Sequence, residues 1–322
     1  MSARVVVLDD DPTGTQCASG VLVAVDPDPA ALTGLDGRAL YVLTNTRAVD
    51  ARSAARIVRG VRSAFEARAG ETVMVLRGDS TLRGHVAVEM EALGLDRGVG
   101  LIVPAYPAAG RLTLGGVHYL ESPAGRLNAA DTEFARDPVF GFQSRTLTGW
   151  CREVGLRGPV VLVGLDELKS SGPASVRDAL LAAPPGAVVA PDAADDDDIT
   201  AIARGFSAAR AAGRHVVVRC AAPLAAAIAG TPGRMLAPAH APASRMLVVC
   251  GSHTAAATRQ LERLAGTRRP VRILAAAGLM GPDTTDELAE GARADLADSG
   301  LAIIATERIR RDEHARSITR RG

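Results

Sequence analysis

Short apolar runs recur along the chain, and each is bounded by Gly, Pro or Asp. Their apolar residues are nearly continuous rather than alternating, which is typical of strands that a parallel sheet buries on both faces. Helical patterns separate several runs; at residues 54–65, for example, apolar residues follow one helix face. The pattern predicts an α/β fold with a mostly parallel sheet. The predicted strands are Val5–Leu8, Val21–Val25, Leu40–Leu43, Val73–Leu76, Leu101–Val103, Val160–Val163, Val188–Ala190, Val216–Val218, Leu247–Cys250, Ile273–Ala275 and Ala302–Ala305.

One segment, residues 231–245, is rich in proline and small residues and has weak periodicity, which is typical of a linker. Residues 1–230 before it are long enough for a layered α/β domain with its own core. Residues 246–322 after it are few for a second α/β domain. We therefore expect an N-terminal domain, a linker, and a second, incomplete α/β domain.

Composition excludes several classes of protein. The chain has 37 basic and 36 acidic residues, with a formal net charge of +1, so no charge excess favours nucleic acid or a membrane surface. No apolar run approaches the ~20 residues of a membrane span. The four cysteines lie far apart, as expected of reduced thiols. The apolar stretch at the N-terminus is short for a signal peptide, so we expect a cytoplasmic protein.

Polar clusters follow four of the predicted strands. Ligands of parallel sheets bind beyond the carboxyl ends of the strands, so these clusters are candidates for one shared site. Arginine binds carboxylates with two parallel hydrogen bonds, Asp and Ser or Thr bind hydroxyls, and a carboxylate can accept a hydroxyl proton. The mixture favours a small polyhydroxy anion over a set of ordinary helix caps or ion pairs. The clusters are Asp9–Gln16, Thr44–Arg47, Arg77–His85 and Pro104–Arg111.

A fifth cluster, Gly251–Thr254, lies between a predicted strand and a helical pattern. A turn that opens a helix exposes backbone N–H groups suited to phosphate, although many strand–helix turns share this feature. The chain lacks both the phosphate-binding loop GxxxxGK[ST] and the dinucleotide motif GxGxxG. No histidine pair has the spacing of metal ligands, so we expect no metal site built by the protein.

In their order along the chain, these clusters resemble the motifs of the four-carbon acid sugar kinase family, which phosphorylates threonate, erythronate or 3-oxo-tetronate with ATP. The resemblance spans nearly the whole chain, and its strings DSTLRGH and TEFARDPVFG are specific. The matching stretches are Asp9–Gln16, Leu43–Arg47, Gly78–His85 with Glu89, Pro104–Tyr119, Thr132–Ser144 and Gly251–Leu264.

The resemblance implies a carbohydrate kinase that transfers phosphate to an alcohol group. It implies acid-sugar binding by the N-terminal domain, ATP binding largely by the C-terminal one, and Mg²⁺ to offset phosphate charge. It places the catalytic base at Asp11 or Asp79. It leaves open which tetronate is used and the oligomeric state, for which a homodimer is one candidate. The substrate motif falls on Asp10, Asp11, Arg47, Asp79, Ser80 and Thr81, with Arg83 nearby, and the nucleotide motif on Gly251, Ser252 and Thr258.

Two other functions stay open. Asp9-x-Asp11-x-Thr13 after an apolar strand is also the pattern of haloacid dehalogenase-type phosphatases, in which Asp9 would attack phosphate. In that scheme Lys169 would bind phosphate and Asp195–Asp198 would bind a metal, but DSTLRGH is left unexplained. Members of the kinase family continue with a Gly-rich nucleotide loop, so we expect this chain to be C-terminally shortened. A catalytically inactive acid-sugar-binding protein is therefore the second alternative.

Overall fold

The computed structural model describes residues 4–35, 37–66, 72–122, 125–233, 244–266, 270–274 and 282–308. The chain forms two compact units, one from the described residues up to 233 and one from residues 244–308. The predicted linker at 231–245 falls mostly outside the described residues, so it stays a prediction.

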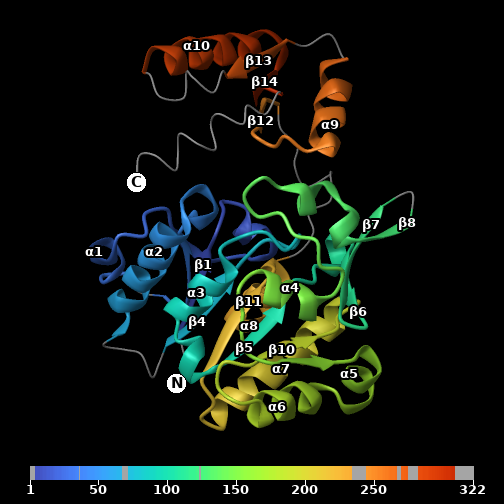
Figure 1. Cartoon of the computed structure of the whole chain (residues 1–322). Helices are drawn as coiled ribbons and strands as arrows, with labels where there is room; N and C mark the ends of the chain where they lie inside the picture. The colour runs from blue at the N-terminus through green and yellow to red at the C-terminus, as the bar shows by residue number, and fades with distance from the viewer. Residues whose placement is uncertain are drawn as a thin grey trace. The chain divides into compact units, whose positions relative to one another are not determined.

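An eight-stranded parallel sheet forms the centre of unit 1 (Figure 1). All eight strands predicted in this part of the chain are present, and the predicted α/β class is confirmed. Their apolar runs are continuous because helices cover both faces of the sheet. In order across the sheet, the strands are β2 (Leu22–Ala24), β3 (Ala39–Leu43), β1 (Arg4–Asp9), β4 (Thr72–Arg77), β11 (Val216–Cys220), β5 (Val99–Val103), β10 (Val188–Pro191) and β9 (Val160–Val163).

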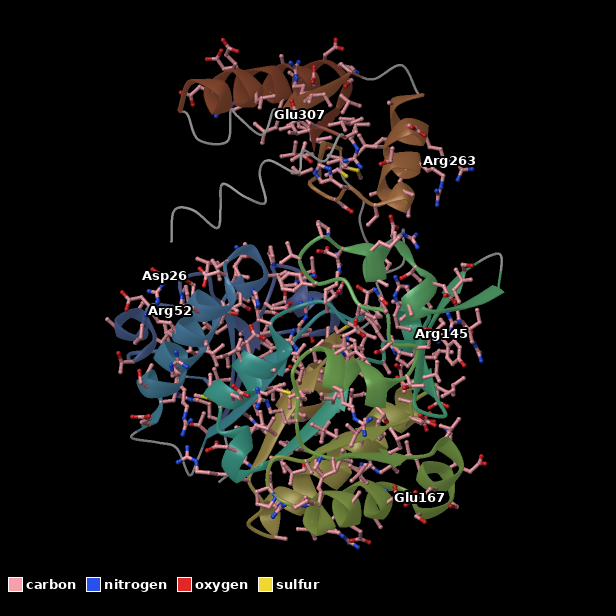
Figure 2. All side chains as sticks on the ribbon, viewed as in Figure 1. Asp26, Arg52, Arg145, Glu167, Arg263 and Glu307 are labelled. Carbon is pink, nitrogen blue, oxygen red and sulfur yellow. The ribbon has the colours of Figure 1, made fainter. Side chains whose placement is uncertain are left out.

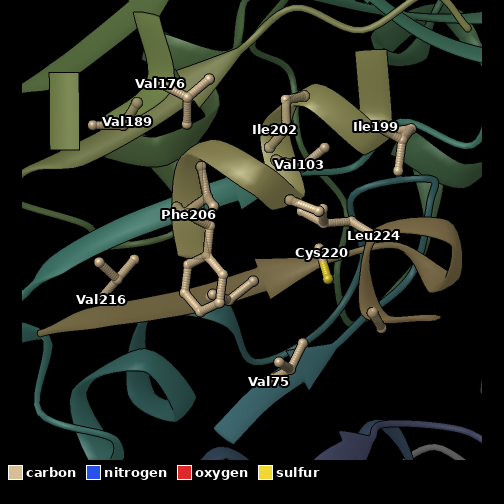
Figure 3. Close-up of a cluster of buried hydrophobic side chains, with 14 of the residues drawn as sticks. Val75, Val103, Val176, Val189, Ile199, Ile202, Phe206, Val216, Cys220 and Leu224 are labelled. Carbon is tan, nitrogen blue, oxygen red and sulfur yellow. The ribbon is translucent and has the colours of Figure 1, made fainter. Parts of the chain in front are cut away.

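Each face of the sheet packs against four helices. Phe206 and Ile202 of α7 and Leu224 of α8 lie in one core cluster with Val75 and Cys220 (Figure 3). Each large apolar side chain in such a cluster contributes roughly 1.5–3 kcal/mol. The helices of this face are α5 (Leu165–Ser171), α6 (Pro173–Ala182), α7 (Asp196–Ala211) and α8 (Ala222–Ala229). Those of the other face are α1 (Pro29–Leu32), α2 (Ala51–Ala64), α3 (Val86–Ala92) and α4 (Leu147–Glu153).

Unit 1 also contains a small antiparallel sheet that the sequence pattern did not predict. It consists of β6 (Arg111–Leu114), β7 (Val117–Ser122) and β8 (Gly125–Asn128). These strands mix apolar with charged and hydroxyl side chains, so they lack the continuous apolar runs that marked the others. Gly115 and Gly116 form the two-residue turn between β6 and β7, with φ of 60° and 70°. Such turns require the left-handed region, which favours glycine.

Unit 2 has a three-stranded parallel sheet with the order β12-β14-β13. Its core includes Leu261, Ile303 and Ala305. The predicted strand Ile273–Ala275 is found at Val271–Leu274, and Ala275 lies outside the described residues. Among the helices that the structure describes, none has the length and apolarity to cross a membrane. The elements are β12 (Met246–Cys250), α9 (Ala255–Ala265), β13 (Val271–Leu274), α10 (Pro282–Ser299) and β14 (Leu301–Thr306).

Candidate functional site

The carboxyl ends of three adjacent strands, β1, β4 and β11, bring charged residues together at one edge of the large sheet. Asp9 ends β1 and lies in register with Arg77, which ends β4. Side chains alternate along a strand, so Asp9 and Arg77 lie on the same face as Val7 and Val75. Arg219 of β11 lies on the opposite face. Exposed charged residues such as Asp26 and Arg52 lie on the surface (Figure 2), whereas these strand-end charges are buried.

The buried Arg77 guanidinium contacts three successive carboxylates. Its Nε lies 3.2 Å from Asp9 Oδ1, and its Nη1 lies 3.1 Å from Asp10 Oδ1 and 3.0 Å from Asp11 Oδ1. Its Nη2 donates to the Thr13 hydroxyl at 2.8 Å. Arg77 therefore fixes the directions of all three aspartates that follow β1.

On the other face, Arg219 joins Asp10 to a residue of α3. Its Nη2 lies 2.9 Å from Asp10 Oδ2, and its Nη1 is paired with Glu89. Asp10 and Glu89 are 2% and 1% exposed. A Cβ at Gly78 or Gly84 would collide with the Arg219 guanidinium, so glycine at these positions makes room for it. The motif glycines thus accommodate a buried charge.

Arg47 lies above these buried pairs and is partly exposed. Its guanidinium is paired with Asp11, its Nη1 lies 3.7 Å from Asp79 Oδ1, and its Nε lies 3.4 Å from Asp10 Oδ1. The backbone supports it, because Arg47 N–H donates to Asp10 O at 3.3 Å. The side chains of Arg47, Asp11 and Asp79 are 16%, 19% and 12% exposed. A ligand from solvent can therefore reach this group.

Asp79 connects Arg47 to a second partly exposed arginine. Arg83 Nε lies 2.7 Å from Asp79 Oδ2, which also accepts from the Thr81 hydroxyl. The Arg83 guanidinium lies over the Phe134 ring, and its Nη1 is 3.5 Å from Asp137 Oδ2. Carboxylates and guanidiniums thus alternate along the rim of the site, which suits a ligand with both a carboxylate and hydroxyl groups.

Burial and charge shift the pKa values of these carboxyls in opposite directions. Burial raises the pKa of Asp9 to about 7, although Arg77 acts against it. Burial also raises the pKa of Asp10, against the effect of Arg219. Burial also acts to raise the pKa of Asp79, but the charges of Arg83 and Arg47 and the hydrogen bonds to Asp79 outweigh burial, so the pKa of Asp79 is lowered. Asp79 therefore remains a carboxylate at neutral pH and can accept a hydrogen bond or a proton.

The structure brings together six of the predicted substrate residues: Asp10, Asp11, Arg47, Asp79, Thr81 and Arg83. For the predicted residue Ser80 the structure gives a backbone contact with a residue outside this group, because its carbonyl is 2.8 Å from His118 Nε2, so its role in substrate binding stays a prediction. The sequence analysis placed Arg77 in the cluster Arg77–His85 but gave it no role, and it missed Arg219. Each is a charged residue at the end of an otherwise apolar buried strand, and that contrast could have identified them.

The residues of the phosphatase hypothesis have other contacts. Asp9 is buried, and its carboxylate packs directly against Gly14, where a Cβ would collide with it. Lys169 lies 2.8 Å from Asp195 and 2.7 Å from Asp198. Asp195 and Asp198 form the capping box of α7. This arrangement argues against Asp9 as a nucleophile that phosphate could reach.

The predicted nucleotide residues lie in unit 2, after β12. Thr254 rather than Ser252 caps α9, because its hydroxyl accepts from Ala257 N–H at 3.2 Å. Arg308 Nη2 donates to Ser252 O at 2.6 Å and to the Thr258 hydroxyl at 2.7 Å. Gly251 and Ser252 therefore precede the helix, and their role in nucleotide binding stays a prediction.

A cavity of about 570 Å³ lies at the opposite edge of the sheet, where β4 and β11 begin. Arg62 and His215, which line it, contact the carbonyls of Ala92 and Leu93 at the end of α3. Cations in such positions stabilise helix ends, and the negative ends of helix dipoles disfavour an anion. In the part of the chain that the structure describes, no three His, Cys, Asp or Glu residues form a metal-binding group.

An α/β domain with buried charge pairs beneath a rim of alternating aspartates and arginines has the features of a binding site for small polar anions at the carboxyl ends of its strands. The chain matches the family model described as "Sugar-binding N-terminal domain" over residues 5–228. It belongs to the four-carbon acid sugar kinase family.

One curated relative is the D-erythronate kinase of Heliobacterium modesticaldum, which is 29% identical over an alignment of 278 residues that covers 81% of this chain. The match covers 60% of that relative, so the chain spans about 60% of its length.

Solved structures share the fold. A Salmonella typhimurium LT2 protein described as a putative tRNA synthase aligns with a TM-score of 0.64 at 19% identity, over 96% of this chain and 75% of that one. A Bordetella bronchiseptica domain of unknown function, solved with bound citrate as a domain-swapped dimer, aligns with a TM-score of 0.55 at 24% identity, over 96% and 75%.

Proposed function

We propose that this chain is an ATP-dependent kinase that phosphorylates a hydroxyl of a four-carbon acid sugar. The observation that carries the proposal is the position of Arg47 between Asp11 and Asp79, at an edge where three strands end. Family membership and the kinase relative support it. In this proposal the substrate carboxylate binds Arg47 or Arg83, and the substrate hydroxyls donate hydrogen bonds to Asp11 and Asp79.

Each group at the rim has a chemical role in the proposal. Asp79 or Asp11 accepts the proton of the attacking substrate hydroxyl. At the same time the hydroxyl oxygen forms a bond to the γ-phosphorus of ATP, and the bond between this phosphorus and the leaving ADP oxygen breaks. Arg77 and Arg219 hold the aspartates without contacting the substrate. Mg²⁺ would be held by the phosphates of its nucleotide and by whichever of Asp11 and Asp79 does not act as the base, and it would offset phosphate charge.

The particular tetronate, the nucleotide contacts and the oligomeric state are parts of the same proposal. D-erythronate is the first substrate to test, because the curated relative is named for it, and threonate and 3-oxo-tetronate are the others. Gly251, Ser252 and Thr258 are the proposed nucleotide contacts. A homodimer is the proposed oligomeric state, which light scattering during size-exclusion chromatography would test.

The experiment is an assay of ADP release with Mg²⁺–ATP and each tetronate, beside an assay of phosphate release from phosphorylated tetronates. We expect ADP release with one tetronate, and a loss of 10²–10⁴-fold in kcat when the base is replaced, in Asp79→Asn or Asp11→Asn. Asp131→Asn removes an aspartate from an exposed arginine pair and serves as the matched control.

Two results would contradict the kinase. Phosphate release from phosphorylated tetronates that Asp9→Asn abolishes would support the phosphatase. Thermal stabilisation by a tetronate, with no ADP release and no stabilisation by Mg²⁺–ATP, would support an inactive binding protein.

A further inference from the structure

The loop between β4 and α3, Gly78–Gly84, carries four of the predicted substrate residues and one residue in a strained conformation. Leu82 has a φ of 71°, and its side chain is buried. A left-handed conformation costs a residue with a Cβ roughly 1–2 kcal/mol. Such residues persist where surrounding contacts hold them. The loop therefore needs an outside restraint to keep Asp79 in place.

His118 of β7 supplies a contact of this kind. It is 2% exposed, and its Nε2 lies 2.8 Å from Ser80 O, in the middle of the loop. A carbonyl oxygen only accepts, so Nε2 carries the hydrogen and donates it. Burial lowers the pKa of His118 to about 4, so the ring is neutral and its Nδ1 accepts from the Thr113 hydroxyl at 3.1 Å. The Ser80 carbonyl thus fixes the tautomer of His118, and the hydroxyl of Thr113 supplies a donor to the other ring nitrogen.

The hairpin that carries His118 is itself fixed to the large sheet. Asp192, just after β10, accepts from the N–H groups of Gly115 and Gly116 at 2.6 Å and 2.9 Å. Thr113 and Ala193 exchange two backbone hydrogen bonds of 2.9 Å. The turn and the first strand of the hairpin are therefore both attached beyond the carboxyl end of β10. A continuous path of hydrogen bonds leads from there to Ser80.

We propose that His118 is a positioning residue, which with the hairpin β6–β7 holds the loop Gly78–Gly84 in the conformation that binds the acid sugar. The role in substrate binding rests on the proposed function, but the restraint on the loop does not. His118 acts through the backbone of Ser80 and contacts no substrate. Asp192 acts one step further away, through the turn of the hairpin.

The test compares His118→Leu with His118→Gln, in which the amide nitrogen can still donate to Ser80 O. Amide hydrogen exchange of residues 79–84 is followed by mass spectrometry, and binding of D-erythronate by calorimetry. Losing the hydrogen bond leaves a partly buried carbonyl without its donor, so we expect roughly 10-fold faster exchange and 10-fold weaker binding in His118→Leu. His118→Gln should restore most of both, and the Kd for Mg²⁺–ATP should stay unchanged.

The matched control is His215→Leu, which removes a histidine–carbonyl contact of 3.2 Å at the opposite edge of the sheet. It should change neither exchange in residues 79–84 nor the Kd for D-erythronate. Asp192→Asn is a second variant that leaves His118 intact and replaces one acceptor of the turn by a donor. We expect faster exchange in both the hairpin and the loop, a readout that remains available if His118→Leu does not fold.

The possible results separate the two proposals. Unchanged loop exchange in His118→Leu, or in Asp192→Asn where the first variant does not fold, overturns the restraint. Faster exchange with an unchanged Kd for D-erythronate overturns the role in substrate binding. If the wild-type chain binds no tetronate, the proposed function fails, and loop exchange alone decides whether His118 restrains the loop.

Discussion

Replacing Arg219 by methionine should destabilise unit 1 strongly, because this substitution leaves a buried carboxylate without a cation. Asp10 keeps Arg77 at 3.1 Å and Arg47 at 3.4 Å, but Glu89 has no other cation among the residues that the structure describes. Removing one partner of a buried pair costs about 3–5 kcal/mol. For a unit of this size, that loss lowers Tm by about 6–20 °C.

A double-mutant cycle with Glu89→Leu separates this cause from a loss of packing. Replacing both partners by apolar residues leaves no uncompensated charge at Glu89, so the double variant should be no less stable than Arg219→Met alone. Urea denaturation monitored by circular dichroism gives the four free energies. Arg145→Met, which breaks an exposed pair with Asp131, should leave the midpoint unchanged. Additive losses from the two single variants would refute the reasoning.

Three further substitutions test other parts of the site. Burial raises the pKa of Asp9 to about 7, above the ~3.9 of an unfolded chain, so this group makes stability fall as pH rises from about 4 to about 7. Asp9→Asn should remove that slope, which is at most about 1.4 kcal/mol of unfolding free energy per pH unit. Urea titrations at pH 5, 6 and 7 measure it, and the same dependence of unfolding free energy on pH in the two proteins would show the reasoning to be wrong. Gly78→Ala places a Cβ against the Arg219 guanidinium and should lower the free energy of unfolding by about 1–3 kcal/mol. The control is Gly164→Ala, whose Cβ meets no atom within 4 Å and which should lower it less. Equal losses of stability in the two variants would argue against the close approach of Gly78 and Arg219. Arg47→Lys loses two-point binding of a carboxylate, so calorimetry should show roughly 10–100-fold weaker binding of D-erythronate, and an unchanged Kd would remove Arg47 from the acid end of the substrate.

The sequence predicted the large sheet well because each of its strands is buried on both faces. Val5–Leu8 and Val73–Leu76 are continuous apolar runs for that reason, and the structure extends them to Arg4–Asp9 and Thr72–Arg77. The hairpin β6–β7 was missed because it is short and carries His118 and Tyr119 within its strands. A pattern search for continuous apolar runs does not detect such strands.

The candidate site was predicted in part. Asp11, Arg47 and Asp79 follow strand ends, and the rule that parallel strands present their carboxyl ends at one edge places them together. Arg77 and Arg219 lie at the ends of β4 and β11, just after the predicted apolar runs Val73–Leu76 and Val216–Val218. Their role depends on which strands are neighbours, and β11 lies between β4 and β5 although it comes more than one hundred residues later in the chain. That order is a property of the fold and is not visible in local sequence.

A crystal structure of the chain with D-erythronate tests the central claim most directly. We expect density for the ligand at the carboxyl ends of β1 and β4, with its carboxylate at Arg47 or Arg83 and a hydroxyl within 3.2 Å of Asp79 or Asp11. Density in the cavity beside Arg62 and His215 at the opposite edge, with none at Arg47, would contradict the claim.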